Sequence, residues 1–166
     1  MAVALLACRL HEVGVASDVS SAGLLEGGRP AWPEARAAML ERGVDLSGHQ
    51  SRRIEPQLVA GADLVLGMTR EHVREAVALH PVAYERSFTL KELVRRAGVQ
   101  PRGPQPLDAW LAHLAAEREI EDLLGASPID DVEDPIGGPL AAVRATAAEL
   151  DGLVGRLVGS AWPAPR

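Results

Sequence analysis

The chain has 166 residues, a hydrophobic fraction of 47% and a formal net charge of −6. This size fits one ordinary domain, and because aromatic residues make up only 3%, its core must be built from Leu, Val and Ala. The charges are spread along the chain, so the clustered basic face of a nucleic-acid-binding protein is not expected. We find neither an apolar run of membrane-spanning length nor a signal peptide, and we therefore expect a cytoplasmic protein that binds no membrane and no nucleic acid.

Apolar residues at helical or strand spacing, separated by Gly and Pro, divide the chain into alternating elements. Helices are predicted over residues 1–13, 33–42, 70–79, 90–96, 107–124 and 140–158, and a short helix or turn over residues 54–60. Strands are predicted over residues 15–21, 62–68 and 84–88. Thr69 is the expected N-cap of the helix that follows it. Thr89 and Glu92 are expected to form a capping box at the start of the next one.

Strands that alternate with helices indicate an α/β fold with a parallel sheet. The stretch 62–68 is a nearly continuous apolar run, as a buried central strand of such a sheet requires. We expect one domain over residues 1–158 and a disordered tail over residues 159–166. Active sites of parallel sheets lie beyond the carboxyl ends of the strands, so loops at that edge are the first candidates for a site.

Cys8 is the only cysteine, which excludes an intramolecular disulfide and a cysteine-based zinc site. Because it lies within the pattern of the first helix, we expect Cys8 to be a packed helix residue. The histidines are scattered, with no pair at close ligand spacing beside a carboxylate motif. No metal and no cofactor are therefore predicted.

A carboxylate-rich loop precedes the last predicted helix, where residues 130–139 read Asp-Asp-Val-Glu-Asp-Pro-Ile-Gly-Gly-Pro. Pro135 restricts Asp134 to extended or turn geometry, so Asp134 is presented from a loop of restricted shape. A loop aspartate held in this way suits a general acid, which must reach a leaving group in one geometry. The alternative is an acidic loop that only complements the positive end of the helix dipole. The remaining carboxylates of this loop are expected to be solvated charges: Asp130, Asp131 and Glu133.

The order of these segments resembles the low-molecular-weight protein tyrosine phosphatase family. The matching pieces cover nearly the whole chain: MAVALL at 1–6, VSSAG at 19–23, GVDLSGHQSR at 43–52, ADLVLGMT at 62–69 and Asp-Pro at 134–135. The resemblance implies a three-layer, phosphotyrosine phosphatase I-like fold. It also implies hydrolysis of phosphate monoesters in phosphotyrosine proteins through a cysteinyl-phosphate intermediate, with Asp134 as the general acid.

The family's chemistry also requires a cysteine, five residues and an arginine in a loop whose backbone N–H groups hold the phosphate. Six residues after Cys8 stands Gly14, so this loop is missing from the sequence. The family's first strand, which lies in the middle of the sheet, is expected to be missing with it. We therefore expect an N-terminally truncated and inactive version of the fold. Ile136 stands where many relatives carry an aromatic, which argues against a preference for aromatic substrates.

Two explanations of the missing loop stay open: a true start upstream of Met1, or a non-catalytic remnant that serves as a binding module. A lost central strand leaves backbone groups unpaired at about 1–3 kcal/mol each. Several such losses rival a total stability of about 5–15 kcal/mol, which favours the upstream start. A homodimer that exchanges a strand between subunits would support the remnant. A third interpretation is an arsenate reductase, whose thiol-relay versions need downstream cysteines that this sequence lacks.

Overall fold

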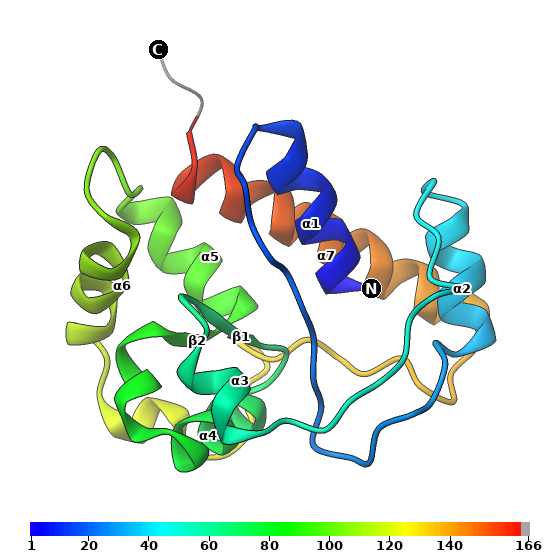
Figure 1. Ribbon diagram of the computed structural model, residues 1–166, viewed down its shortest axis with the longest axis horizontal. Coiled ribbons are helices and arrows are strands. Elements are labelled where there is room, and N and C mark those ends of the chain that lie inside the picture. Colours follow the sequence, from blue (N-terminus) through cyan, green and yellow to red (C-terminus); the bar gives the residue numbers. More distant parts are fainter. Residues whose placement is uncertain (164–166) are drawn as a thin grey trace.

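The computed structural model of the protein describes residues 1–163 and shows a mainly helical fold with one short parallel sheet (Figure 1). The elements in chain order are α1 (Ala2–Glu12), α2 (Pro33–Leu40), α3 (Pro56–Ala60), β1 (Val65–Gly67), α4 (Arg70–Leu79), the 3-10 helix η1 (Pro81–Arg86), β2 (Ser87–Thr89), α5 (Leu90–Val99), α6 (Leu107–Ala116), the 3-10 helix η2 (Ile120–Leu123) and α7 (Leu140–Ala161). The α/β class and the parallel sheet are thus confirmed.

The sheet consists of β1 and β2, which pair in parallel with Leu66 opposite Phe88. Every residue of β2 is buried, whereas Val65 and Leu66 of β1 are only half-buried. Within residues 1–163, β1 has a hydrogen-bonded neighbour on one side alone. A strand with the apolar sequence of a central strand therefore lies at an edge of the described sheet, contrary to the expectation for residues 62–68.

Helix α4 connects the two strands and packs closely on β1 through Gly67. A Cβ atom at Gly67 would lie 2.9 Å from the carbonyl oxygen of Thr69 and 2.9 Å from Cγ2 of Val73. There is no room for a side chain here, because the strand turns into the helix within two residues. Thr69 caps this helix as predicted, since its hydroxyl accepts a hydrogen bond from the backbone N–H of His72.

Residues 15–21 do not form the predicted strand. The segment after α1 runs down the molecule as an open stretch of chain (Figure 1). Two contacts hold the end of this segment. Nε of Arg52 donates a hydrogen bond to the carbonyl oxygen of Ser21 at 2.9 Å, and Gly23 forms an isolated parallel β-bridge with Arg53. A strand forms only where another strand supplies ladder hydrogen bonds, and no strand of the described chain lies beside this segment.

The long helix α7 is the support of the domain, because α1, α2 and α5 all pack against it. It ends at Ala161, three residues after the predicted end, while residues 164–166 of the predicted tail lie outside the described part of the chain.

The predicted helix over 107–124 is interrupted after Ala116, and the 3-10 helix η2 follows at Ile120–Leu123. Cys8 is exposed on α1, whose buried residues are Leu5 and Leu10, so the expectation of a packed cysteine is wrong.

None of the helices placed within residues 1–163 combines the length and the apolar character needed to cross a membrane. The same part of the chain holds no group of three or more His, Cys, Asp or Glu side chains arranged to bind a metal ion.

Candidate active site

The acidic loop meets the sheet at the carboxyl end of β1. The backbone N–H of Val132 donates to the carbonyl oxygen of Met68, one residue beyond the strand, at 2.8 Å. Val132 is itself buried and packs in the main core. Because ligand sites of parallel sheets lie beyond the carboxyl ends of the strands, this contact brings the loop to the expected edge. Asp134 follows only two residues later.

Asp134 presents a carboxylate to solvent from a defined turn. The residue is exposed, and its Oδ1 accepts a hydrogen bond from the backbone N–H of Ile136 at 3.0 Å. This is the Asx-turn pattern, which fixes the side chain against its own backbone. Gly137 continues the turn with φ 77°, a conformation that favours glycine. No other hydrogen bond to the Asp134 carboxylate is found among residues 1–163, so its second oxygen is available to a ligand.

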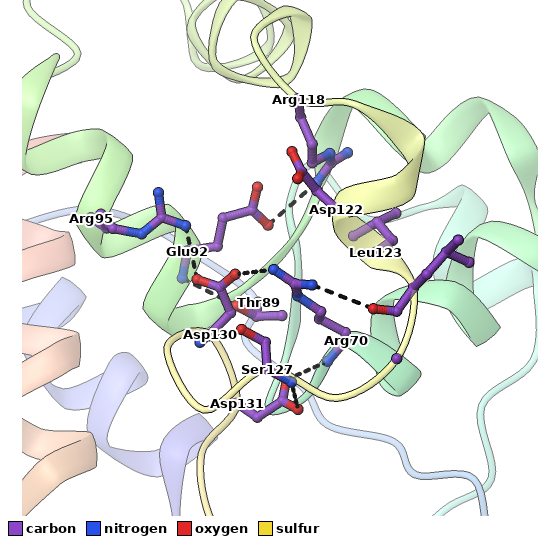
Figure 2. Close-up of polar contacts among 12 residues, drawn as sticks. Arg70, Thr89, Glu92, Arg95, Arg118, Asp122, Leu123, Ser127, Asp130 and Asp131 are labelled. Atoms are coloured by element: carbon purple, nitrogen blue, oxygen red, sulfur yellow. Dashed lines mark hydrogen bonds and ion pairs between the residues drawn. The ribbon is translucent and has the colours of Figure 1, made fainter.

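Asp130 is not the solvated charge that the sequence predicted. It is 4% exposed, and each of its carboxylate oxygens accepts a hydrogen bond from an arginine (Figure 2). Nη2 of Arg70 lies 2.8 Å from Oδ2, and Nη2 of Arg95 lies 2.8 Å from Oδ1. Burial raises the pKa of Asp130, but the hydrogen bonds and charges of the two arginines outweigh it and hold that pKa below its usual value.

Asp131 is also held, and the solvated charge predicted for it is wrong. Its Oδ1 accepts the backbone N–H of Arg70 at 2.8 Å, and its Oδ2 accepts the backbone N–H of Ser127 at 2.8 Å. The N–H group of Arg70 lies in the first turn of α4 and has no acceptor within the helix, so Asp131 supplies one. Its negative charge also interacts favourably with the positive end of the helix dipole. Glu133, in contrast, is exposed as predicted.

Four basic side chains from α4 and α5 hold the segment of residues 123–132, and we call them the cationic clamp: Arg70, Arg74, Lys91 and Arg95. Besides the contacts of Asp130, Nη1 of Arg74 donates to the carbonyl oxygen of Gly125 at 2.9 Å. Nζ of Lys91 donates to the carbonyl oxygen of Asp131 at 2.8 Å and pairs with Glu149 of α7 at 2.7 Å. The helices that follow both strands thus fix the loop that leads to Asp134.

A second buried ion cluster joins Glu92 of α5 to the backbone of β2 through Arg118. Arg118 is fully buried, and its Nη1 donates to the carbonyl oxygen of Ser87 at 2.8 Å. The same nitrogen lies 3.5 Å from Oε2 of Glu92 (Figure 2). Glu92 also pairs with Arg96. The guanidinium lies over the ring of Tyr84, 4.2 Å from its centroid. Helix α6 ends at Ala116, two residues before Arg118.

Cys8 has none of the surroundings of a phosphate-binding nucleophile. It lies inside α1, where the backbone N–H groups are used by the helix rather than forming a nest for an anion. The neighbouring Arg9 is engaged by Asp151 at 2.8 Å and by Glu12 at 3.2 Å. The structure therefore brings no cysteine and free arginine together in the part of the chain that it describes.

Sequence reasoning identified the loop of Asp134 but missed the cationic clamp. The clamp residues precede the loop by more than thirty residues, and no local pattern links them to it. The available signal was weak: a basic residue lies in the first turn of each helix that follows a strand, Arg70 after β1 and Lys91 after β2. Such a position faces the carboxyl edge of the sheet, where the loop arrives.

Comparison with known proteins agrees with this architecture. Residues 1–109 match the family described as low molecular weight phosphotyrosine protein phosphatase, and the chain belongs to that family. The match ends before the acidic loop and therefore does not bear on Asp134.

Individual relatives extend the likeness to nearly the whole chain. A protein-arginine-phosphatase of Geobacillus stearothermophilus is 27% identical over 141 residues, which are 84% of this chain and 74% of that protein. The crystal structure of a low molecular weight protein tyrosine phosphatase from T. tengcongensis is 30% identical, with a TM-score of 0.70 over 95% of this chain and 86% of the other. A structure of the YwlE arginine phosphatase, a cysteine-to-serine mutant with a phosphorylated active-site serine, is 27% identical with a TM-score of 0.69 over 94% and 82%.

Proposed function

We propose that residues 1–166 carry the general-acid part of a cysteine-dependent protein phosphatase site, with Asp134 as the acid. The observation that carries the proposal is the contact between Val132 and Met68, which brings an exposed carboxylate to the carboxyl edge of the sheet. In its protonated form Asp134 would donate a proton to the leaving group, and as a carboxylate it would then activate the water that hydrolyses the phosphoenzyme. In the YwlE relative, an active-site serine in place of cysteine is phosphorylated, which supports a covalent route.

The nucleophilic part of such a site is not among the described residues, and we infer that this chain alone does not hydrolyse phosphate esters. The sequence contains no cysteine that is followed by five residues and then an arginine, and Cys8 lies exposed on a helix. The edge of β1 that is unpaired within residues 1–163 supports the same inference, because an apolar strand with one hydrogen-bonded neighbour keeps backbone groups with which a further strand could pair. A working enzyme would need that strand and a phosphate loop from outside residues 1–166.

For the substrate we propose a phosphorylated protein, with phosphotyrosine as the first candidate because the matching family carries that description. Phosphoarginine is the second candidate, and the identity of residue 136 favours it over phosphotyrosine. Ile136, next to the acid dipeptide, is 72% exposed and offers an aliphatic surface rather than an aromatic ring for stacking. A protein phosphatase of this kind would act in the cytoplasm.

A non-catalytic module that binds a partner is the alternative of a different class. It would keep the fold of residues 1–163 and use the acidic loop as a contact surface. It predicts a chain that is stable and monodisperse as it stands, or a homodimer in which a strand from a second copy covers the free edge of β1. Sedimentation analysis of the purified 166-residue chain separates these states.

The proposal is tested on the protein isolated from its own cells, with phenyl phosphate and a phosphoarginine peptide as substrates, because the leaving groups of both need a proton. If that protein turns over either substrate, Asp134→Asn should lower kcat by about 100-fold, the usual contribution of a general acid. Glu133→Gln is the matched control, because it removes a neighbouring exposed carboxylate and should leave kcat within about twofold, as a solvated charge away from the chemistry does. Equal losses in the two variants would refute the role of Asp134.

A further inference from the structure

The carboxylate of Asp130 is the most strongly held group near the candidate acid, although it faces no ligand position itself. It is buried, and it joins Arg70 of α4 to Arg95 of α5 through two hydrogen bonds of 2.8 Å (Figure 2). Arg70 also donates to the carbonyl oxygen of Leu124, so one guanidinium connects the two ends of the segment that precedes Asp134. A buried carboxylate with two arginine partners fixes three separate parts of the chain at once.

The residues between Asp130 and Asp134 are held in place as well. Asp130 is followed by Asp131, which is bonded on both carboxylate oxygens, and by Val132, which is buried and bonded to Met68. Beyond Val132 no side chain of the acidic loop is buried, and the turn at Asp134 is made by the loop itself. The direction in which Asp134 leaves the sheet is thus set by the last anchored residues before it.

We propose that Asp130 is a positioning residue, which orients the acidic loop through Arg70 and Arg95 and thereby holds the carboxylate of Asp134 at the carboxyl edge of the sheet. The value of this placement for catalysis rests on the proposed function, because an acid must be held within a narrow geometry to protonate a leaving group. The placement itself is a property of residues 123–136 and can be measured without turnover.

Asp130→Asn is the principal variant, because it keeps the shape of the side chain and removes its charge. Arg95→Gln is the second, and since the Arg95 side chain is 51% exposed, this variant should fold even where Asp130→Asn does not. Glu92→Gln is the matched control. Glu92 is a buried carboxylate paired with two arginines, Arg96 and Arg118, and no hydrogen bond or ion pair of the described chain joins it to residues 126–138.

Amide hydrogen exchange of the 166-residue chain reports the placement directly. The reporters are the N–H groups of Asp131 and Val132, which donate to the carbonyl oxygens of Ser127 and Met68 in the wild-type loop. At equal global stability, the protection factors of both reporters should fall about tenfold in Asp130→Asn or Arg95→Gln and stay unchanged in Glu92→Gln. Unchanged exchange in the first two variants, or an equal increase in all three, would overturn the proposal.

A kinetic measurement on the form isolated from its own cells separates positioning from a general loss of structure. A misplaced acid slows the hydrolysis of phenyl phosphate, whose leaving group needs a proton, more than that of p-nitrophenyl phosphate, whose leaving group does not. Asp130→Asn should therefore lower kcat/KM, which reports the departure of the leaving group and not the later phosphoenzyme hydrolysis that both esters share, about tenfold more for phenyl phosphate than for p-nitrophenyl phosphate. Equal losses for both esters would contradict the positioning role. If that form has no activity at all, the proposed function fails, while the exchange rates still decide whether Asp130 orients the loop.

Discussion

Replacing Arg118 by methionine should be among the most destabilising single changes in this protein. The side chain is fully buried, and its guanidinium donates hydrogen bonds to the backbone carbonyls of Ser87 and Tyr84. It also lies 3.5 Å from the buried carboxylate of Glu92. Methionine fills most of the volume but leaves these oxygens without their charged partner.

The magnitude follows from the contacts that are lost. Each hydrogen bond to a charged group contributes about 1.5–3 kcal/mol net, and breaking a buried ion pair by removing one partner costs about 3–5 kcal/mol. Because Glu92 keeps Arg96 as a partner, we expect a loss of about 3–4 kcal/mol, within the range found for broken buried pairs. For a domain of this size such a loss lowers Tm by about 10 °C.

Urea unfolding followed by far-UV circular dichroism measures the change in the free energy of unfolding. Arg156→Met on α7 is the matched control, because Arg156 is exposed and both residues are good helix formers, so its effect should be within about 0.5 kcal/mol. Glu92→Gln should couple with Arg118→Met by about 1–3 kcal/mol in a double-mutant cycle. A loss below 1 kcal/mol for Arg118→Met, comparable with the control, would refute the reasoning that this cluster fixes the junction of α6 and β2.

Three further outcomes follow from individual contacts. The folded-state pKa of Asp130 is held below its unfolded value, so its contribution to stability is present above about pH 4 and lost as the pH falls further; in urea titrations at several pH values, Asp130→Asn should show a weaker loss in this acid range than the wild type. Gly67→Val should lower the free energy of unfolding by about 1–3 kcal/mol, because there is no space for a side chain between β1 and α4. Gly48→Ala is the matched control: no atom lies within 4 Å of the added Cβ, so the urea midpoint should be unchanged or raised. Asp134→Asn should leave Tm within about 1 °C of the wild type, since the residue is exposed and the amide oxygen can accept the same hydrogen bond from Ile136; a large drop in Tm would identify Asp134 as a structural residue instead.

Local signals predicted the helices well, because caps and helical spacing act within a few residues. Helix α4 begins at Arg70 and ends at Leu79 as predicted, with Thr69 as its cap. The capping box at Thr89 is only half confirmed. The Thr89 hydroxyl accepts the backbone N–H of Glu92, but the Glu92 side chain turns away to Arg96 and Arg118. A buried ion cluster overrides the local pairing, and its partners are too distant in sequence to be foreseen.

The strand over residues 15–21 and the solvated state of Asp130 were wrong for the same physical reason. Strand formation depends on a neighbouring strand, and the burial of a carboxylate depends on cations brought by other elements. Neither condition can be read from the segment itself. The dipeptide of Asp134 and Pro135 was recognised because its geometry is local, and the structure presents Asp134 from an exposed turn as expected.

The most direct test of the account is the turnover of p-nitrophenyl phosphate by the purified 166-residue chain, measured beside its Cys8→Ser variant. We predict no release of p-nitrophenol above the background of that variant, because the exposed thiol of Cys8 lies on a helix and has no phosphate loop around it. Turnover by the wild-type chain that is lost in the Cys8→Ser variant would contradict the account, because it would show that these residues contain a complete nucleophilic site.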